Sequence, residues 1–337
     1  MAAPGPGRHP GGLPELGGGR PAVVAPGLVQ RLGAGARSRS PSGCGRQQRR
    51  DRAPGAGPTP PVIGVCTDSN AQLPPELAAR LGVEVVPLTV SIDGVDYAEG
   101  VDLDADRFYA HYAHGARPTV TTAAPSPGRF GEAYRRLAAR GAGAIVSVHI
   151  GAELSGTLNA AGLAARDSPV PVSVVDTGSA SFVVALAAWA ACDAAAAGAS
   201  VEQAAAAAQA VAASCGNVFV VGTLDLARAG GRMAPASGDQ PGVPVLRLAQ
   251  GKIETMGLAS SAAEAAAAMA DAVLSSGPRL RVAVGASDES SRPVADALAS
   301  TLLEAPGAVE VVRYRVGPSV GAHTGPGTAG AVYHPVG

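Results

Sequence analysis

From residue 62 onward, short apolar runs alternate with segments that carry helix signals. Three of the runs are rich in β-branched residues and apolar on both faces: 62–68, 144–150 and 170–177. Pro or Ser opens the intervening helical segments, which we predict at 74–82, 126–140 and from 155. A strand that is apolar on both faces must be covered on both sides. The alternation therefore predicts an α/β fold with a parallel sheet between two layers of helices.

The pattern changes near residue 216. Before it, 83–92 is predicted as one strand that turns at Asp93-Gly94, and a capping box at Ser200 opens a helix over 201–214. After it come a Gly- and Pro-rich segment, a hairpin that turns at Gly251-Lys252, and further helices and strands. We therefore predict three parts: a disordered basic leader over 1–60, a parallel α/β domain over 61–215, and a smaller α+β domain over 216–337.

The leader holds nine arginines against only Glu15 and Asp51, and it is dense in Gly and Pro without an aromatic residue. This composition favours a disordered leader, although a basic arm that touches nucleic acid or a membrane surface is the alternative. The sequence lacks 18 consecutive strongly apolar residues, so no membrane span is predicted. Its four cysteines lack metal-ligand spacing, and no secretory signal is evident. We expect a cytoplasmic protein without nucleic acid, metal or cofactor.

Hydroxyl-rich turns follow several predicted strands, and we predict that each turn opens a helix. They lie at 67–69, 121–126, 155–157 and 323–328. In an open parallel sheet, ligands bind outside the carboxyl ends of the strands. Helix N-termini there offer free N–H groups, which suit an anion. Neutral hydroxyls and one imidazole, without a neighbouring Lys or Arg, favour a singly charged carboxylate over a polyphosphate. Simple helix capping is the alternative for any single turn.

Two motifs match enzyme signatures by letter. Residues 325–330 match GxGxxG, but only seven residues follow, too few for a dinucleotide-binding unit. Residues 317–321 match the GxSxG nucleophile elbow, but His323 follows at once and no Asp or Glu comes after Glu310. His323 lies in a polar, Gly-rich stretch and is interpreted as functional.

Other titratable residues are interpreted as structural. His149 ends a buried strand, while His111 and His114 are expected to face solvent. Asp68 and Asp176 end strands at the same sheet edge. They are either an acid pair or, as we favour, caps of the segments that follow.

An ordered series of segments resembles the DegV family: VCTDSNAQLP, TTAAPSPGRF, SGTLNAA, VVDT, TLDLARAGGRM and GPSVGAHTGPGT, over about 62–332. The resemblance implies two α/β domains with a fatty acid between them, and some members of that family present acyl chains to a fatty-acid kinase. Two departures stand out. The family's TSQPS-like segment reads TAAPS from Thr122, and 233–245 is polar where relatives carry an apolar helix.

The resemblance also implies residue roles. It assigns the carboxylate to Thr122, to Ser155 with Gly156, and to His323 with Thr324, while Arg228 and Arg232 correspond to a segment that docks the kinase. The function hypothesis is a non-catalytic carrier of a long-chain fatty acid, with no catalytic residue and the fatty acid as its bound ligand. The rival is a small-molecule hydrolase or phosphotransfer enzyme that uses His323 with Ser155 or Ser319.

Overall fold

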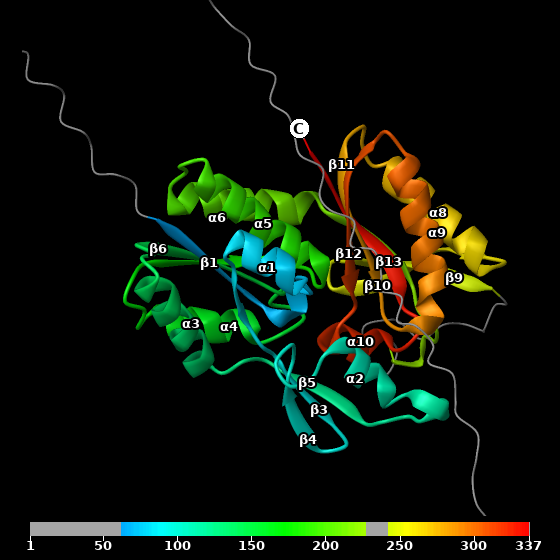
Figure 1. Ribbon diagram of the computed structural model, residues 1–337, viewed down its shortest axis with the longest axis horizontal. Helices are drawn as coiled ribbons and strands as arrows, with labels where there is room; N and C mark the ends of the chain where they lie inside the picture. The colour runs from blue at the N-terminus through cyan, green and yellow to red at the C-terminus, as the bar shows by residue number, and fades with distance from the viewer. Residues whose placement is uncertain (1–61, 227–241, 337) are drawn as a thin grey trace, which may run out of the picture. The chain divides into compact units, whose positions relative to one another are not determined.

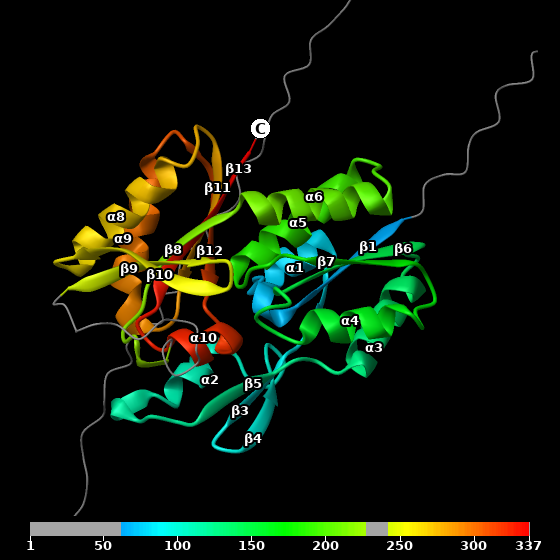
Figure 2. The same ribbon diagram turned by 180° about the vertical axis from the view of Figure 1, so that it is seen from behind.

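Three β-sheets organise the part of the chain that the structure, a computed structural model, describes: residues 62–226 and 242–336 (Figure 1, Figure 2). The first sheet is wholly parallel and has four strands, in the order β2 (Glu84–Val86), β1 (Ile63–Asp68), β6 (Ala144–His149) and β7 (Val172–Asp176). Three of these strands correspond to the doubly apolar runs of the sequence, as a parallel sheet covered on both faces requires.

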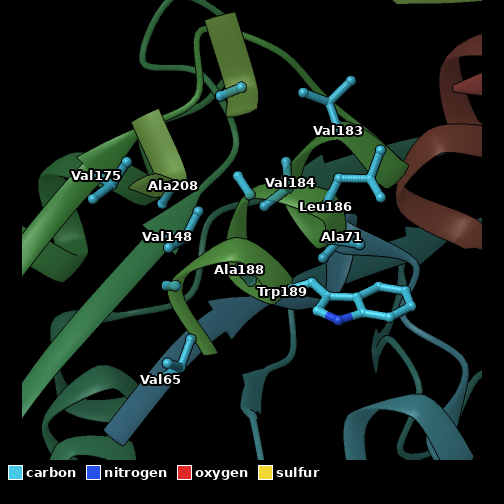
Figure 3. Close-up of a cluster of buried hydrophobic side chains, with 14 of the residues drawn as sticks. Val65, Ala71, Val148, Val175, Val183, Val184, Leu186, Ala188, Trp189 and Ala208 are labelled. Carbon is cyan, nitrogen blue, oxygen red and sulfur yellow. The ribbon is translucent and has the colours of Figure 1, made fainter. Parts of the chain in front are cut away.

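Helices cover both faces of the parallel sheet. On one face lie α1 (Pro75–Leu81), α5 (Phe182–Ala196) and α6 (Val201–Ser214). On the other lie α3 (Pro127–Ala139) and α4 (Thr157–Ala165) (Figure 1). Helix α5 is buried along most of its length, and its side chains pack with valines of β1, β6 and β7 (Figure 3). The predicted α/β class, with a parallel sheet between two helical layers, is confirmed.

The second sheet is mixed and contains six strands in the order β10 (Lys252–Ala259), β9 (Val243–Ala249), β8 (Gly216–Val220), β13 (Ala329–Pro335), β11 (Leu280–Ala286) and β12 (Ala308–Arg315). Only β11 and β12 among these neighbours run parallel. Two helices, α8 (Ala262–Leu274) and α9 (Arg292–Glu304), bury one face. The strand β13 comes after the others in the chain but lies between β8 and β11, in the middle of the sheet. The predicted domain start at residue 216 coincides with the start of β8, and the two-domain division stays a prediction.

One predicted strand was wrong. The run 83–92 forms two strands, β2 in the parallel sheet and β3 (Thr89–Ile92) in a third, antiparallel sheet with β4 (Val95–Ala98) and β5 (Val120–Ala123). Pro87 separates them, and a proline has no N–H with which to continue a ladder. The third sheet was not predicted, and it carries Thr122.

The structure also corrects the setting of His323. The sequence predicted a polar turn that opens a helix, but His323 lies near the end of α10 (Pro318–Thr324). The Gly-rich turn after α10 leads into β13 instead. Pro318 at the first turn favours this helix start. Helix α10 packs on α2 (Ala105–Ala110), where Tyr109 and Phe108 belong to a buried apolar cluster with Ala322.

Candidate ligand-binding site

An apolar cavity of about 150 Å³ lies between loops of the parallel sheet, helix α10 and the mixed sheet. Leu154 and Ile150 line it from the segment after β6, and Val320 lines it from α10. Further apolar lining comes from strands of the mixed sheet and from Val316, which follows β12. The residues on the strands are Val218, Phe219, Leu248, Ile253, Ala331 and Val332. A concave, mostly apolar space with a few polar groups is the usual form of a small-molecule site, because burial of apolar ligand surface supplies the affinity.

Polar side chains lie where this cavity meets a second, adjacent cavity, and we call this place the polar junction. Thr122, Ser155 and His323 line both the apolar cavity and an adjacent cavity of about 510 Å³. The Oγ1 atom of Thr122 and the Nε2 atom of His323 lie 3.4 Å apart. The structure thus brings together three residues that the sequence placed in one site, from a strand of the third sheet, a loop after β6 and helix α10.

Local structure explains how each side chain reaches the junction. Along β5, Thr121 and Ala123 are exposed whereas Thr122 is half-buried, because successive residues of a strand face opposite sides. Ser155 precedes α4, and its Oγ lies 2.8 Å from Thr157 Oγ1 while accepting from Thr157 N. The first N–H groups of α4 therefore lie beside Ser155, where the positive end of the helix dipole favours an anion.

The other predicted site residues divide into three groups. Thr324 lines the apolar cavity, although its hydroxyl donates to the Val320 carbonyl within α10. Gly156 lines only the adjacent cavity, at the N-cap of α4. Arg228 and Arg232 lie outside the described residues. Ser319, the alternative nucleophile, lines the apolar cavity, and its Oγ accepts from Asn70 Nδ2 and Gln72 Nε2 over 3.2 and 3.3 Å.

Sequence reasoning missed a second polar cluster in the wall of the apolar cavity. Asn70 uses both ends of its amide, since its Oδ1 accepts from Ser181 N and its Nδ2 donates to Ser319. Ser181 has φ +61° and ψ −146°, a conformation that costs a non-glycine residue energy and that tends to occur at ligand sites. Its hydroxyl lies 3.2 Å from the hydroxyl of Tyr314, whose pKa burial raises to about 12. The signal for Asn70 was its place directly after β1.

A buried carboxyl lies behind this cluster. Glu99, 5% exposed, accepts from Ser319 N over 2.8 Å and from Ser69 Oγ over 2.5 Å, and desolvation raises its pKa. It lines a cleft of about 700 Å³ that also reaches Tyr314. Tyr314 thus lines both this cleft and the apolar cavity. No sequence pattern pointed to Glu99.

One arrangement resembles a catalytic triad. Ser147 Oγ lies 2.7 Å from His149 Nε2, and His149 Nδ1 lies 2.9 Å from Asp68 Oδ2, with all three side chains fully buried. Tyr134 Oη lies 2.9 Å from Ser147 Oγ, so the serine is enclosed by the core. None of the three residues lines a cavity described above. The arrangement therefore tightens the junction of β1 and β6 rather than offering a nucleophile.

The two strand-ending aspartates are not an acid pair. Asp68 accepts from His149 and from the backbone N–H groups of Ile150 and Asn70. Asp176 accepts instead from the N–H groups of Ala152 and Gly178.

His111 and His114 are exposed. Within the described ranges, no group of three or more His, Cys, Asp or Glu side chains is placed to hold a metal ion, and no helix is both long and apolar enough to cross a bilayer.

Comparison with known proteins places these features in a family. Residues 62–336 match the family model described as "Uncharacterised protein, DegV family". A DegV domain-containing protein of Streptomyces coelicolor is 39% identical over 275 residues, which cover 80% of this chain and 97% of that protein.

Solved structures agree. One, described as showing fatty acid binding of a DegV family protein from Thermus thermophilus, superposes with a TM-score of 0.72 at 31% identity, covering 81% of this chain and 99% of that one. A stearic acid-binding protein from Eubacterium ventriosum superposes with a TM-score of 0.68 at 25% identity, covering 81% and 98%. The chain therefore belongs to the DegV family.

Proposed function

We propose that this chain binds a long-chain fatty acid and acts as a non-catalytic carrier. The acyl tail occupies the apolar cavity, and the carboxylate lies at Thr122, Ser155 and His323. The observation that carries the proposal is the coincidence of these three polar side chains with one junction of an otherwise largely apolar space. The fatty acid binding described for the DegV family protein of Thermus thermophilus and for the stearic acid-binding protein of Eubacterium ventriosum supports the same ligand class.

The chemistry of the three side chains suits a carboxylate. A threonine hydroxyl rotates to donate, and an imidazole with a proton on Nε2 donates along its ring plane. With Thr122 Oγ1 and His323 Nε2 only 3.4 Å apart, both can donate to one carboxylate, and Ser155 adds a third hydroxyl. Each buried methylene of the tail adds ~0.8 kcal/mol, so the tail supplies most of the affinity and the polar groups set the orientation.

The serine pairings support a carrier rather than a hydrolase. Ser155 Oγ is paired with Thr157 Oγ1, and Ser319 Oγ lies between two amide donors. Neither arrangement activates a serine, because activation requires a base that accepts the hydroxyl proton.

A first experiment is native mass spectrometry of the purified protein, followed by denaturing extraction and lipid identification. A fatty acid at near-equal stoichiometry is the expected result. An empty protein that also fails to take up added oleate or stearate would contradict the proposal.

A second experiment tests the head group. Thr122→Val and His323→Ala should each weaken fatty-acid binding in calorimetry, whereas Thr119→Val should not, because Thr119 is exposed and lines neither of the two cavities. Unchanged affinity in both site variants would exclude these residues as carboxylate ligands.

We further propose that the bound carboxylate is presented to a fatty-acid kinase subunit. The adjacent cavity of about 510 Å³ supports access to the carboxylate from outside the tail pocket. Arg228 and Arg232 are the proposed docking residues. Arg232→Glu should retain fatty-acid binding but lose phosphorylation by a kinase subunit from the same organism, while the exposed control Arg166→Glu retains both. Equal phosphorylation of the Arg232 variant would reject the docking role.

A further inference from the structure

Glu99 is a buried carboxyl group, and its burial must be compensated by hydrogen-bond donors. It follows β4 in the third sheet and is 5% exposed. Removal of a carboxylate from water is costly unless hydrogen-bond donors replace the lost water. Glu99 receives three such donors: Ser319 N at 2.8 Å, Ser69 Oγ at 2.5 Å and Gln72 Nε2 at 3.4 Å. Every one of these groups donates, as an ionised carboxylate requires.

The donors come from the elements that hold the polar junction. Ser319 lies in the first turn of α10, and His323 lies one turn further along the same helix. Glu99 itself belongs to the end of the hairpin whose strand β3 pairs with β5, the strand of Thr122. Ser69 and Gln72 follow β1. One carboxylate thus joins the helix of His323, the sheet of Thr122 and the end of the parallel sheet.

Helix α10 depends on this carboxylate for its N-terminal cap. Its N-cap residue is Gly317, which has no side chain to accept from the first N–H groups. Glu99 supplies the acceptor for Ser319 N from another element, and Gln72 Oε1 accepts from Gly317 N.

The fit at Gly317 is tight. A Cβ atom there would lie 2.7 Å from Gln72 Oε1 and 3.0 Å from Glu99 Oε1. The φ of Gly317 is −82°, which other residues adopt freely, so a side chain at 317 would be met by the ends of these two side chains and not by backbone strain. Glu99 and Gln72 therefore lie directly against the start of α10.

We infer that Glu99 is a positioning residue for the carboxylate site: it fixes α10 against the third sheet and so sets His323 beside Thr122. This inference rests on the proposed function. Glu99 does not line the apolar cavity, so it acts on a bound carboxylate through α10 rather than by contact.

The test compares a fatty acid with its methyl ester, which shares the tail but lacks the charge. Wild-type protein should prefer palmitate to methyl palmitate in a fluorescence displacement assay. Glu99→Gln preserves shape but turns one acceptor into a donor that faces N–H and O–H groups. We expect the acid-over-ester preference to fall about tenfold, the size expected from loss of one hydrogen bond to a charged group, with ester affinity unchanged.

A milder variant and a control complete the design. Ser69→Ala removes one donor to Glu99 from a part-buried site and should reduce the preference about threefold, even if Glu99→Gln does not fold. Glu76→Gln neutralises an exposed carboxylate that lines the same cleft and should leave the preference unchanged.

The outcomes are distinguishable. Absence of an acid preference in the wild-type protein would overturn the proposed function and this inference with it. A wild-type preference that persists in Glu99→Gln and Ser69→Ala would overturn the positioning role alone. Equal loss of acid and ester affinity would also overturn it, because general damage to the cavity lowers both.

Discussion

Thr122 Oγ1 and His323 Nε2 lie 3.4 Å apart although 201 positions separate them in the chain. If both donate to one carboxylate, their contributions to affinity depend on each other. Thr122→Val and His323→Ala should each weaken fatty-acid binding about tenfold, and the double variant should lose less than the product of the two losses. Isothermal titration calorimetry on the four proteins completes the cycle. Strictly multiplicative losses would mean that the two residues act separately.

The ionisation of Glu99 should have opposite effects on stability and on selectivity. Burial raises its pKa above the ordinary value of 4.5, so the folded state binds its proton more tightly than the unfolded state does. Stability from this group is therefore complete below about pH 4.5 and declines as pH rises through the raised pKa. Relative to Glu99→Gln, the wild-type protein should lose thermal stability across that window while gaining preference for acid over ester.

Other charged or titratable groups near Glu99 are present in both the wild-type protein and the Glu99→Gln variant. Their effects on stability therefore cancel in the difference between the two. They lie along the same cleft or on elements packed against it: Asp68, Glu76, Asp104, Asp288, Arg292, Asp296, Arg313, Arg315 and His323. Differential scanning fluorimetry from pH 4 to pH 8 measures the stability difference. A difference that does not change with pH would refute the assignment.

Gly321 should tolerate no side chain. A Cβ atom there would lie 2.4 Å from the Tyr109 hydroxyl oxygen and 2.7 Å from the ring of Phe108, so Gly321→Ala must push α10 away from α2. We expect a loss of about 1–3 kcal/mol in the free energy of unfolding, together with a reduced acid-over-ester preference. Gly162→Ala in α4 is the control, because nothing lies within 4 Å of its Cβ position. That substitution should stabilise by about 0.5–1 kcal/mol. Urea denaturation separates the two.

The buried pair of Asp68 and His149 should be structural. Asp68→Asn weakens a contact between two fully buried side chains and should cost roughly 3–5 kcal/mol of unfolding free energy. Asp176→Asn, at the end of the neighbouring strand, should cost only about 1 kcal/mol, because its contacts are exposed. A serine-reactive phosphonate should leave Ser147 unlabelled in the native protein. Labelling there would revive the enzyme hypothesis.

The parallel sheet could be predicted because its signal is local. The run 144–150 is mostly apolar, and every residue of β6 is buried, as in a strand that is covered on both faces. The helix that carries His323 could not be predicted, because three glycines and a proline within 317–325 indicate a turn. Tertiary contacts decide for a helix there: Gly321 lets α10 approach Tyr109, and Glu99 caps its first turn.

The site was predictable to the extent that it follows strand ends. Ser155 belongs to a hydroxyl-rich segment after the apolar run 144–150, whereas Thr122 lies within β5, and the structure brings both to one cavity. Asn70, in the same position after β1, could have been included by that rule. Glu99 could not have been included, because its role depends on the third sheet. The strands of that sheet are short and partly exposed, and no apolar pattern in the sequence predicts them.

The position of β13 has a consequence for synthesis of the protein. Every neighbour of Ala329–Pro335 in the mixed sheet leaves the ribosome earlier, yet β8 and β11 can be joined only through this strand. Until it emerges, the sheet is split into two halves with exposed edges. Helix α10, directly before β13, has no finished wall to pack against in that interval. The part of the cavity wall that β13 supplies is therefore added last, after every other strand of the mixed sheet has been synthesised.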